Sequence, residues 1–174
     1  SSALFLSVSN SSCVKDKIDV DKPNLLVIMT DEHSIRTLGC YREHMAECQR
    51  NLWGSSLKIE TPNIDRLASE GALCLNFFTS APVSTPARAS FQTGLYPAAA
   101  GAPINGMPMD SNLMTFADVL SENGYSTTYV GKWHLAGVPK IPGRMYYEPG
   151  FSFGWQNRNY MFETDHEKWY KVKE

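Results

Sequence analysis

The sequence predicts an α/β fold in which a mostly parallel sheet is flanked by helices. Apolar runs typical of strands at 25–30, 72–79 and 125–130 alternate with segments of helical pattern at 61–71 and from 115 onward. This alternation argues for βαβ units, because parallel strands need a crossover that is usually a helix. The 174 residues suffice for one compact domain or for a piece of a larger one.

The first predicted strand is the uninterrupted apolar run Leu25-Leu26-Val27-Ile28-Met29. Such a run is typical of a strand whose two faces are both covered by helices. It is far shorter than the ~20 residues that a membrane-spanning helix needs, so no membrane span is expected. Residues 1–22 before it read as a cropped signal or leader peptide, or else as a disordered N-terminus.

Two predicted helices have recognisable ends. Residues 61–71 begin with Thr61 as a cap and Pro62 at the first helical position, and a glycine ends them. The second helix begins after Thr115 and ends at 123–124. A short helix from about 86 to 93 follows the strand expected at 72–79. From 139 onward we expect loops, with a late helix near 166–173.

Composition excludes some classes of function. The net charge of −2 gives no basic excess to attract nucleic acid. Four cysteines without C-x-x-C spacing disfavour a zinc knot or a thioredoxin-like motif. They leave open one bridge, such as Cys40 to Cys48, or free thiols with Cys74 buried.

Polar clusters follow three of the predicted elements, at 31–33, 84–88 and 132–134. In open α/β sheets ligands bind beyond the carboxyl ends of the strands, so these clusters are expected to share one site. A serine at a helix start, here Ser84, lies beside unpaired N–H groups and the positive end of the helix dipole. Arg88 can hold a charged group at the same helix start.

The segment Ser84-Thr85-Pro86-Ala87-Arg88, followed by Thr93-Gly94, resembles the signature of type I, formylglycine-dependent sulfatases in its serine form, S-x-P-x-R. Three more segments match in the family's order, at 30–33, 61–68 and 131–135. The resemblance covers roughly 23–137. It implies an alkaline-phosphatase-like fold, with 23–174 as the N-terminal, incomplete part of a sulfatase catalytic domain.

The resemblance implies that a serine-type sulfatase-maturating enzyme oxidises Ser84 to formylglycine, whose hydrate attacks the sulfur of a sulfate ester. The substrate would be a sulfated carbohydrate or an aryl sulfate. By the same resemblance, Arg88 would steady the formylglycine and Lys132 would bind both it and the sulfate. His134 would take the proton that drives elimination of sulfate.

The resemblance also implies a calcium site, or a magnesium site, with Asp31, Glu32 and the modified Ser84 as ligands. The family often has Asp at the position of Glu32. Its remaining metal ligands, its leaving-group acid and a second sulfate-binding lysine find no candidate motif in 1–174. We therefore expect a fragment, or a second chain that completes the site. A periplasmic or secreted location is expected.

Two other interpretations stay open. A phosphatase or phosphodiesterase of the same superfamily could use unmodified Ser84, although Pro86, Arg88 and the Thr93-Gly94 pair favour a sulfatase. A non-catalytic remnant would at most bind sulfated glycan.

Aromatic and polar residues of the C-terminal part form either a sugar-binding rim or a set of packing contacts. They are Tyr146, Tyr147, Trp155, Asn157 and Arg158.

Overall fold

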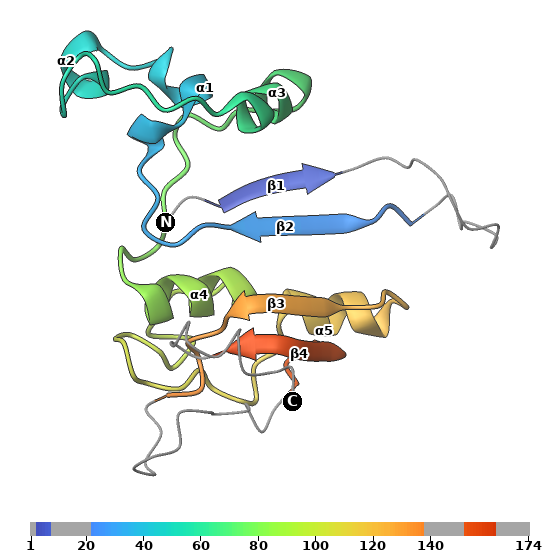
Figure 1. Ribbon diagram of the computed structural model, residues 1–174. Coiled ribbons are helices and arrows are strands. Elements are labelled where there is room, and N and C mark those ends of the chain that lie inside the picture. Colours follow the sequence, from blue (N-terminus) through green and yellow to red (C-terminus); the bar gives the residue numbers. More distant parts are fainter. Residues whose placement is uncertain (1–2, 8–21, 138–151, 163–174) are drawn as a thin grey trace, which may run out of the picture. The chain divides into compact units, whose positions relative to one another are not determined.

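The computed structural model describes residues 3–7, 22–137 and 152–162. The chain divides into two compact units, Ser1–Thr79 and Ser80–Glu174, and each is described by itself. Figure 1 shows the elements of both units.

Strand β2 (Leu25–Met29) of the first unit pairs antiparallel with β1 (Ala3–Ser7). The strand predicted at this position is confirmed, but its burial on both faces is not. Leu25, Leu26 and Ile28 are each about half exposed, at 47%, 51% and 49%. The reason is that no described helix of this unit covers both faces of β2. A pairing strand within residues 1–22 was not foreseen.

The remaining elements of the first unit are short helices: η1 (Ile35–Thr37), α1 (Gly39–Arg42), α2 (Glu47–Arg50) and α3 (Pro62–Glu70). Helix α3 confirms the helix predicted from Thr61 and Pro62. Thr61, however, does not cap α3 with its side chain. Its hydroxyl donates to Asp65 Oδ1 at 3.0 Å and accepts from the Gly39 N–H at 2.9 Å. Asp65 Oδ1 also accepts from the Cys40 N–H at 2.8 Å, so α1 is fixed to the start of α3.

The three described cysteines, Cys40, Cys48 and Cys74, are free thiols. The bridge between Cys40 and Cys48 is therefore not formed, and Cys74 is exposed rather than buried. Burial, followed by the nearby charge of Asp65, raises the pKa of Cys40. Cys40 is therefore more strongly protonated at alkaline pH than a freely exposed thiol.

The strand predicted at 72–79 does not form, and this prediction was wrong. The segment is irregular, with a turn at 75–76. Leu75, Phe77 and Phe78 are 49%, 55% and 83% exposed. Apolar spacing alone suggested a strand, but a strand also needs a neighbour that pairs with its backbone groups, and no described segment pairs with this one.

The second unit contains α4 (Ser84–Thr93), α5 (Phe116–Glu122), β3 (Thr128–Lys132) and β4 (Asn157–Phe162). Strands β3 and β4 are parallel, and helices α4 and α5 belong to the same unit (Figure 1). The predicted α/β class, with parallel strands and flanking helices, is confirmed. Helix α4 begins two residues earlier than expected, and β3 ends two residues later than expected.

Helix α5 starts as the sequence predicts. The Thr115 hydroxyl accepts from the Asp118 N–H, and the Asp118 carboxylate accepts from the Thr115 N–H, which forms a capping box.

Small and aromatic side chains form the core of the second unit. Ala89 of α4 and Ala117 of α5 are fully buried, at 0% exposed. Trp155 packs edge-on against Phe116 and Tyr129, with ring centroids 5.5 and 5.1 Å apart. Edge-to-face pairs of this kind add to the stability gained from burial alone. Trp133 joins the same cluster through Tyr129, at 5.2 Å. Neither Trp133 nor Trp155 has a hydrogen-bond partner for its indole N–H in the described part of the chain.

For Trp155 the structure decides between the sugar-binding rim and packing contacts. Trp155 is only 9% exposed, so its ring packs for stability and offers no open platform. Asn157 is the first residue of β4, and its N–H donates to the Thr127 carbonyl at 3.0 Å. Arg158 follows it in the same strand. Tyr146, Tyr147 and the late helix near 166–173 lie outside the described residues.

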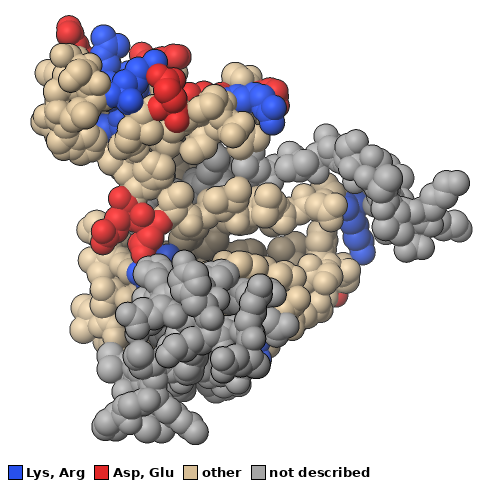
Figure 2. Space-filling model, viewed as in Figure 1, with Lys and Arg blue, Asp and Glu red and all other residues tan. Residues whose placement is uncertain are grey.

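Basic and acidic side chains are intermixed over α1, α2 and α3, as Figure 2 shows for one face. The ion pairs of Lys58 with Glu60 and of Arg66 with Glu70 are solvent-exposed and contribute little stability. Among the described residues no helix is long and apolar enough to cross a membrane.

Gly154 gives a test of how the core closes. It has a φ of +76°, and a Cβ placed there would overlap the backbone of Ala117 and Asp118. Gly94 at the end of α4 has a similar φ of +71° but no atom within 4 Å of such a Cβ. Gly94→Ala should cost about 1–2 kcal/mol through backbone strain alone. Gly154→Ala should cost roughly 3 kcal/mol or more. Urea unfolding of the two variants measures the difference, and equal losses would contradict the overlap.

Candidate active site

Ser84 is the first residue of α4 and is half-buried. Its Oγ lies 3.0 Å from His134 Nδ1 and accepts a hydrogen bond of 3.3 Å from Arg88 Nε. Residues four apart on a helix lie on the same face, which brings Arg88 to Ser84. The imidazole can accept or donate a proton at Oγ according to its tautomer. The arrangement therefore joins a hydroxyl, a proton carrier and a fixed positive charge.

Arg88 is held in place by main-chain and phenol oxygens. Its side chain is nearly buried, with 9% of the residue exposed. Arg88 Nη1 donates to the Lys132 carbonyl at 2.7 Å and to the Tyr129 hydroxyl at 3.5 Å. Tyr129 itself donates to the same Lys132 carbonyl at 2.6 Å. The guanidinium is thereby oriented so that Nε faces Ser84, and the chain at the end of β3 is fixed to α4.

His134 has an uncommon backbone conformation, with a φ of +55°. For a residue with a Cβ this conformation costs about 1–3 kcal/mol and persists only where the surroundings impose it. Thr85, which is 1% exposed, donates from Oγ1 to the His134 carbonyl at 2.9 Å. Trp133 and Leu135 on either side are each 1% exposed. These contacts hold the strained residue with its ring at Ser84.

Lys132 lies at the end of β3 with intermediate exposure, two residues before His134. Trp133 and Leu135 are buried, whereas Lys132 and His134 are partly exposed. Candidate site residues therefore alternate along the chain with buried core residues. The second unit thus contains four of the predicted site residues. The side chains of Ser84, Arg88 and His134 are in contact, and the main-chain carbonyl of Lys132 accepts a hydrogen bond from Arg88.

Asn105 is a neighbour that the sequence did not reveal. Its Oδ1 accepts a hydrogen bond of 2.9 Å from the Thr85 N–H. Val83, the residue before α4, makes no side-chain cap, so Asn105 takes over that task from a distant loop. In the sequence Asn105 precedes Gly106, and an Asn-Gly pair indicates only a turn.

Asp31 and Glu32 belong to the first unit, where both follow β2 and are exposed. Glu32 has a φ of +49°. Their carboxylates suit a hard cation, which prefers oxygen ligands, but calcium takes about 6–8 of them. Across 3–7, 22–137 and 152–162 no cluster of three or more His, Cys, Asp or Glu side chains could hold a metal ion. The two carboxylates therefore offer the kind of ligand atom that such a cation prefers, but the described residues offer too few of them.

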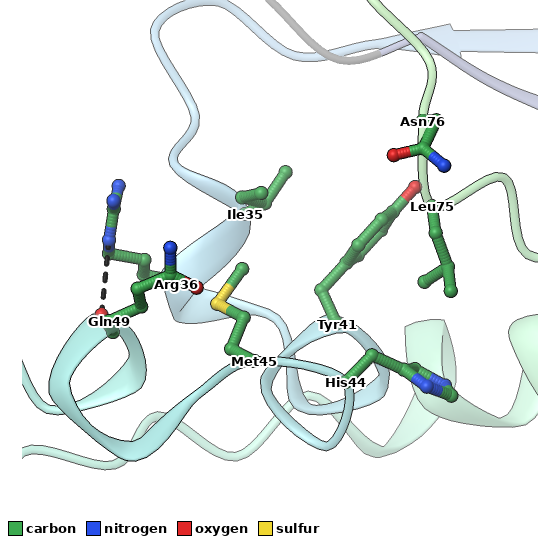
Figure 3. Close-up of a pocket in the computed structure, with 8 residues that line it drawn as sticks. All are labelled: Ile35, Arg36, Tyr41, His44, Met45, Gln49, Leu75 and Asn76. Atoms are coloured by element: carbon green, nitrogen blue, oxygen red, sulfur yellow. Dashed lines mark hydrogen bonds between the residues drawn. The ribbon is translucent and has the colours of Figure 1, made fainter.

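A pocket of about 320 Å³ lies in the first unit. Figure 3 shows its walls. Two of its polar groups already have partners: Arg36 Nε donates to the carbonyl of Gln49, another lining residue, and the Tyr41 hydroxyl donates to the Cys74 carbonyl. None of the candidate catalytic residues lines it. The lining residues are Ile35, Arg36, Tyr41, His44, Met45, Gln49, Leu75 and Asn76.

A hydroxyl at a helix start, with an arginine and a histidine in hydrogen-bond reach, is an arrangement suited to nucleophilic attack on an anionic ester. Comparison with known proteins agrees with this class of site. The family model described as Sulfatase matches residues 23–172, and the chain belongs to the sulfatase family.

The chain is 37% identical to human steryl-sulfatase over 127 residues, which are 66% of this chain and 19% of that protein. It is 30% identical to an N-acetylglucosamine-6-O-sulfatase of Bacteroides thetaiotaomicron over 169 residues, which are 90% of this chain and 27% of that protein. The crystal structure of the sulfatase yidJ from Bacteroides fragilis aligns with a TM-score of 0.44 and 36% identity. That alignment covers 49% of this chain and 20% of the other. The chain thus spans about a fifth to a quarter of these curated relatives.

Thr85 gives a test of how the site is held. Thr85→Val keeps the shape of the side chain but removes the donor to the His134 carbonyl, which leaves a buried acceptor unpaired. The free energy of unfolding should fall by about 1–3 kcal/mol. Thr85→Ser, which restores a hydroxyl, should recover most of the loss. Thermal unfolding measures both, with Thr128→Val at an exposed position of β3 as the control. A Thr85→Val protein as stable as that control would show that this hydrogen bond does not contribute to the stability of the fold.

Proposed function

We propose that the full-length protein hydrolyses sulfate esters, with Ser84 at the position of the nucleophile. One observation carries the proposal: Ser84 Oγ lies 3.0 Å from His134 Nδ1 and 3.3 Å from Arg88 Nε at the start of a helix. Membership of the sulfatase family supports the choice of a sulfate ester.

Each of the four residues has a proposed task. Ser84, oxidised to formylglycine by a serine-type sulfatase-maturating enzyme, supplies the oxygen that attacks sulfur. Arg88 steadies the negative charge at that oxygen, because its Nε–H already points there. His134 holds or moves a proton at the same atom. Lys132 brings its ammonium to the sulfate group.

Asp31, Glu32 and the modified Ser84 are the proposed cation ligands of this chain, and calcium or magnesium is the proposed ion. Carboxylate oxygens suit both ions. When bound, the cation would balance the charge of the sulfate group. The other tasks of the site are assigned to Ser84, Arg88, Lys132 and His134.

The proposed substrate is a sulfated carbohydrate or an aryl sulfate. Relatives named as an N-acetylglucosamine-6-O-sulfatase, an N-acetylgalactosamine-6-O-sulfatase and an ulvan-active sulfatase support the carbohydrate. A periplasmic or secreted location stays a prediction from the sequence.

The second candidate is a phosphatase or phosphodiesterase that uses unmodified Ser84. The contact between its hydroxyl and His134 favours it, because a histidine at 3.0 Å could activate a serine directly. A non-catalytic protein that binds sulfated glycan is the remaining alternative, and it predicts no turnover of either ester.

Replacement of the proposed nucleophile tests the assignment. In the full-length protein, coexpressed with a serine-type maturase, Ser84→Ala should abolish release of sulfate from a model aryl sulfate. Lys132→Ala and His134→Ala should each lower kcat/KM by about 10²-fold or more, since each removes a preorganised charge or a proton carrier.

The control is Lys58→Ala, which removes an exposed charge of the first unit. It should keep wild-type turnover. A Ser84→Ala protein with unchanged activity would sink the proposal, and Lys132→Ala or His134→Ala proteins within twofold of wild type would return those residues to a structural role.

Mass analysis separates the two enzymatic candidates. After coexpression with the maturase, the peptide that contains Ser84 should have lost two hydrogens, about 2 Da, as the conversion of an alcohol to an aldehyde requires. The Ser84→Ala peptide is the matched control and should keep its calculated mass. An unmodified Ser84 in a protein active on phosphate esters would instead support the phosphatase.

A further inference from the structure

We propose that the side-chain amide of Asn105 donates a hydrogen bond to the anionic group of the substrate beside Ser84. This inference rests on the proposed function, because it assigns a substrate contact in that same site. Asn105 lies outside every motif of the sequence analysis, and its place is known only from the fold.

The direction of the Asn105 amide is determined by its partner. The Thr85 N–H, which is at the start of α4, can only donate, so the carboxamide must turn its Oδ1 toward it, and the distance is 2.9 Å. The Nδ2 amino group then points away from that N–H. Asn105 is exposed, and Nδ2 has no partner within the described part of the chain. A pair of donor hydrogens is thus available one residue from the nucleophile.

The loop that carries Asn105 is anchored close to the other site residues. The Met109 N–H donates to the Leu135 carbonyl at 2.9 Å, and Met109 is 3% exposed. Leu135 directly follows His134. Gly137 also approaches this loop, since a Cβ placed there would lie 3.1 Å from Pro108 Cδ. Asn105 is therefore held between the start of α4 and the segment after β3, which is the preorganisation that a substrate contact needs.

The charge of residue 105 distinguishes a capping role from a substrate contact. A carboxylate would accept from the Thr85 N–H as well as an amide does, and it would suit the positive end of the helix dipole. A neutral amide gives up that electrostatic gain but adds two N–H donors. One residue from Ser84, whose Oγ accepts from Arg88, those donors suit an oxygen of an anion, such as sulfate, whereas a carboxylate would repel it.

Asn105→Asp therefore separates the two roles in the full-length, matured protein. The variant keeps the acceptor for Thr85 and replaces the donor with negative charge. Its Tm should equal or exceed that of wild type, while kcat/KM on an aryl sulfate should fall by about 10²-fold. Asn105→Ala should lower both Tm and kcat/KM. Asn63→Asp, the same change at an exposed position of the first turn of α3, is the matched control: its Tm should equal or slightly exceed that of wild type, and kcat/KM should not change.

The outcomes separate this inference from the proposed function. If wild type releases sulfate and Asn105→Asp keeps its kcat/KM, Asn105 only caps α4 and the inference is overturned. If wild type releases no sulfate, the proposed function fails, and binding of inorganic sulfate, measured by calorimetry, decides the inference. Asn105→Asp should then weaken sulfate binding at least tenfold relative to wild type, and equal affinities would overturn the proposal.

Discussion

Arg88 and Thr85 of α4 each donate a side-chain hydrogen bond to a main-chain carbonyl of the segment that ends β3, at Lys132 and at His134. Both side chains are almost fully buried, where hydrogen bonds are not weakened by competing water. The two bonds join segments 44 and 49 residues apart in the chain. The contact between Ser84 and His134, the strained backbone of His134 and the orientation of Arg88 all depend on this connection.

The residues of this connection differ in how far the sequence could predict them. Ser84, Arg88, Lys132 and His134 were foreseen because each belongs to a motif of fixed spacing. The fold confirms that three of their side chains meet. Asn105 was missed because its contribution is a single contact between segments 20 residues apart, and no local pattern encodes it.

The predictions of secondary structure differ in the same way: those that rest on neighbouring residues succeed, and those that need contacts with distant segments fail. Helix α3 and the start of α5 after Thr115 rest on neighbouring residues, and both were predicted. The strand expected at 72–79 and the two-sided burial of β2 require partners from other parts of a chain. Apolar spacing records that a side chain is suited to burial, but it does not say what covers it. Phe78 is 83% exposed in a segment whose pattern suggested a strand.

The burial of Trp133 and Trp155 gives the second unit an optical signature. Both indoles are enclosed by aromatic and aliphatic side chains, without a hydrogen-bond partner for either N–H in the part of the chain that the structure describes. Trp53 of the first unit is 51% exposed to water. Indole emission shifts to longer wavelength in polar surroundings, so, of the tryptophans that the structure describes, Trp133 and Trp155 contribute to the blue edge of the fluorescence spectrum. Because Trp133 is the immediate neighbour of Lys132 and His134, light emitted at that edge reports directly on whether the chain beside Ser84 is folded.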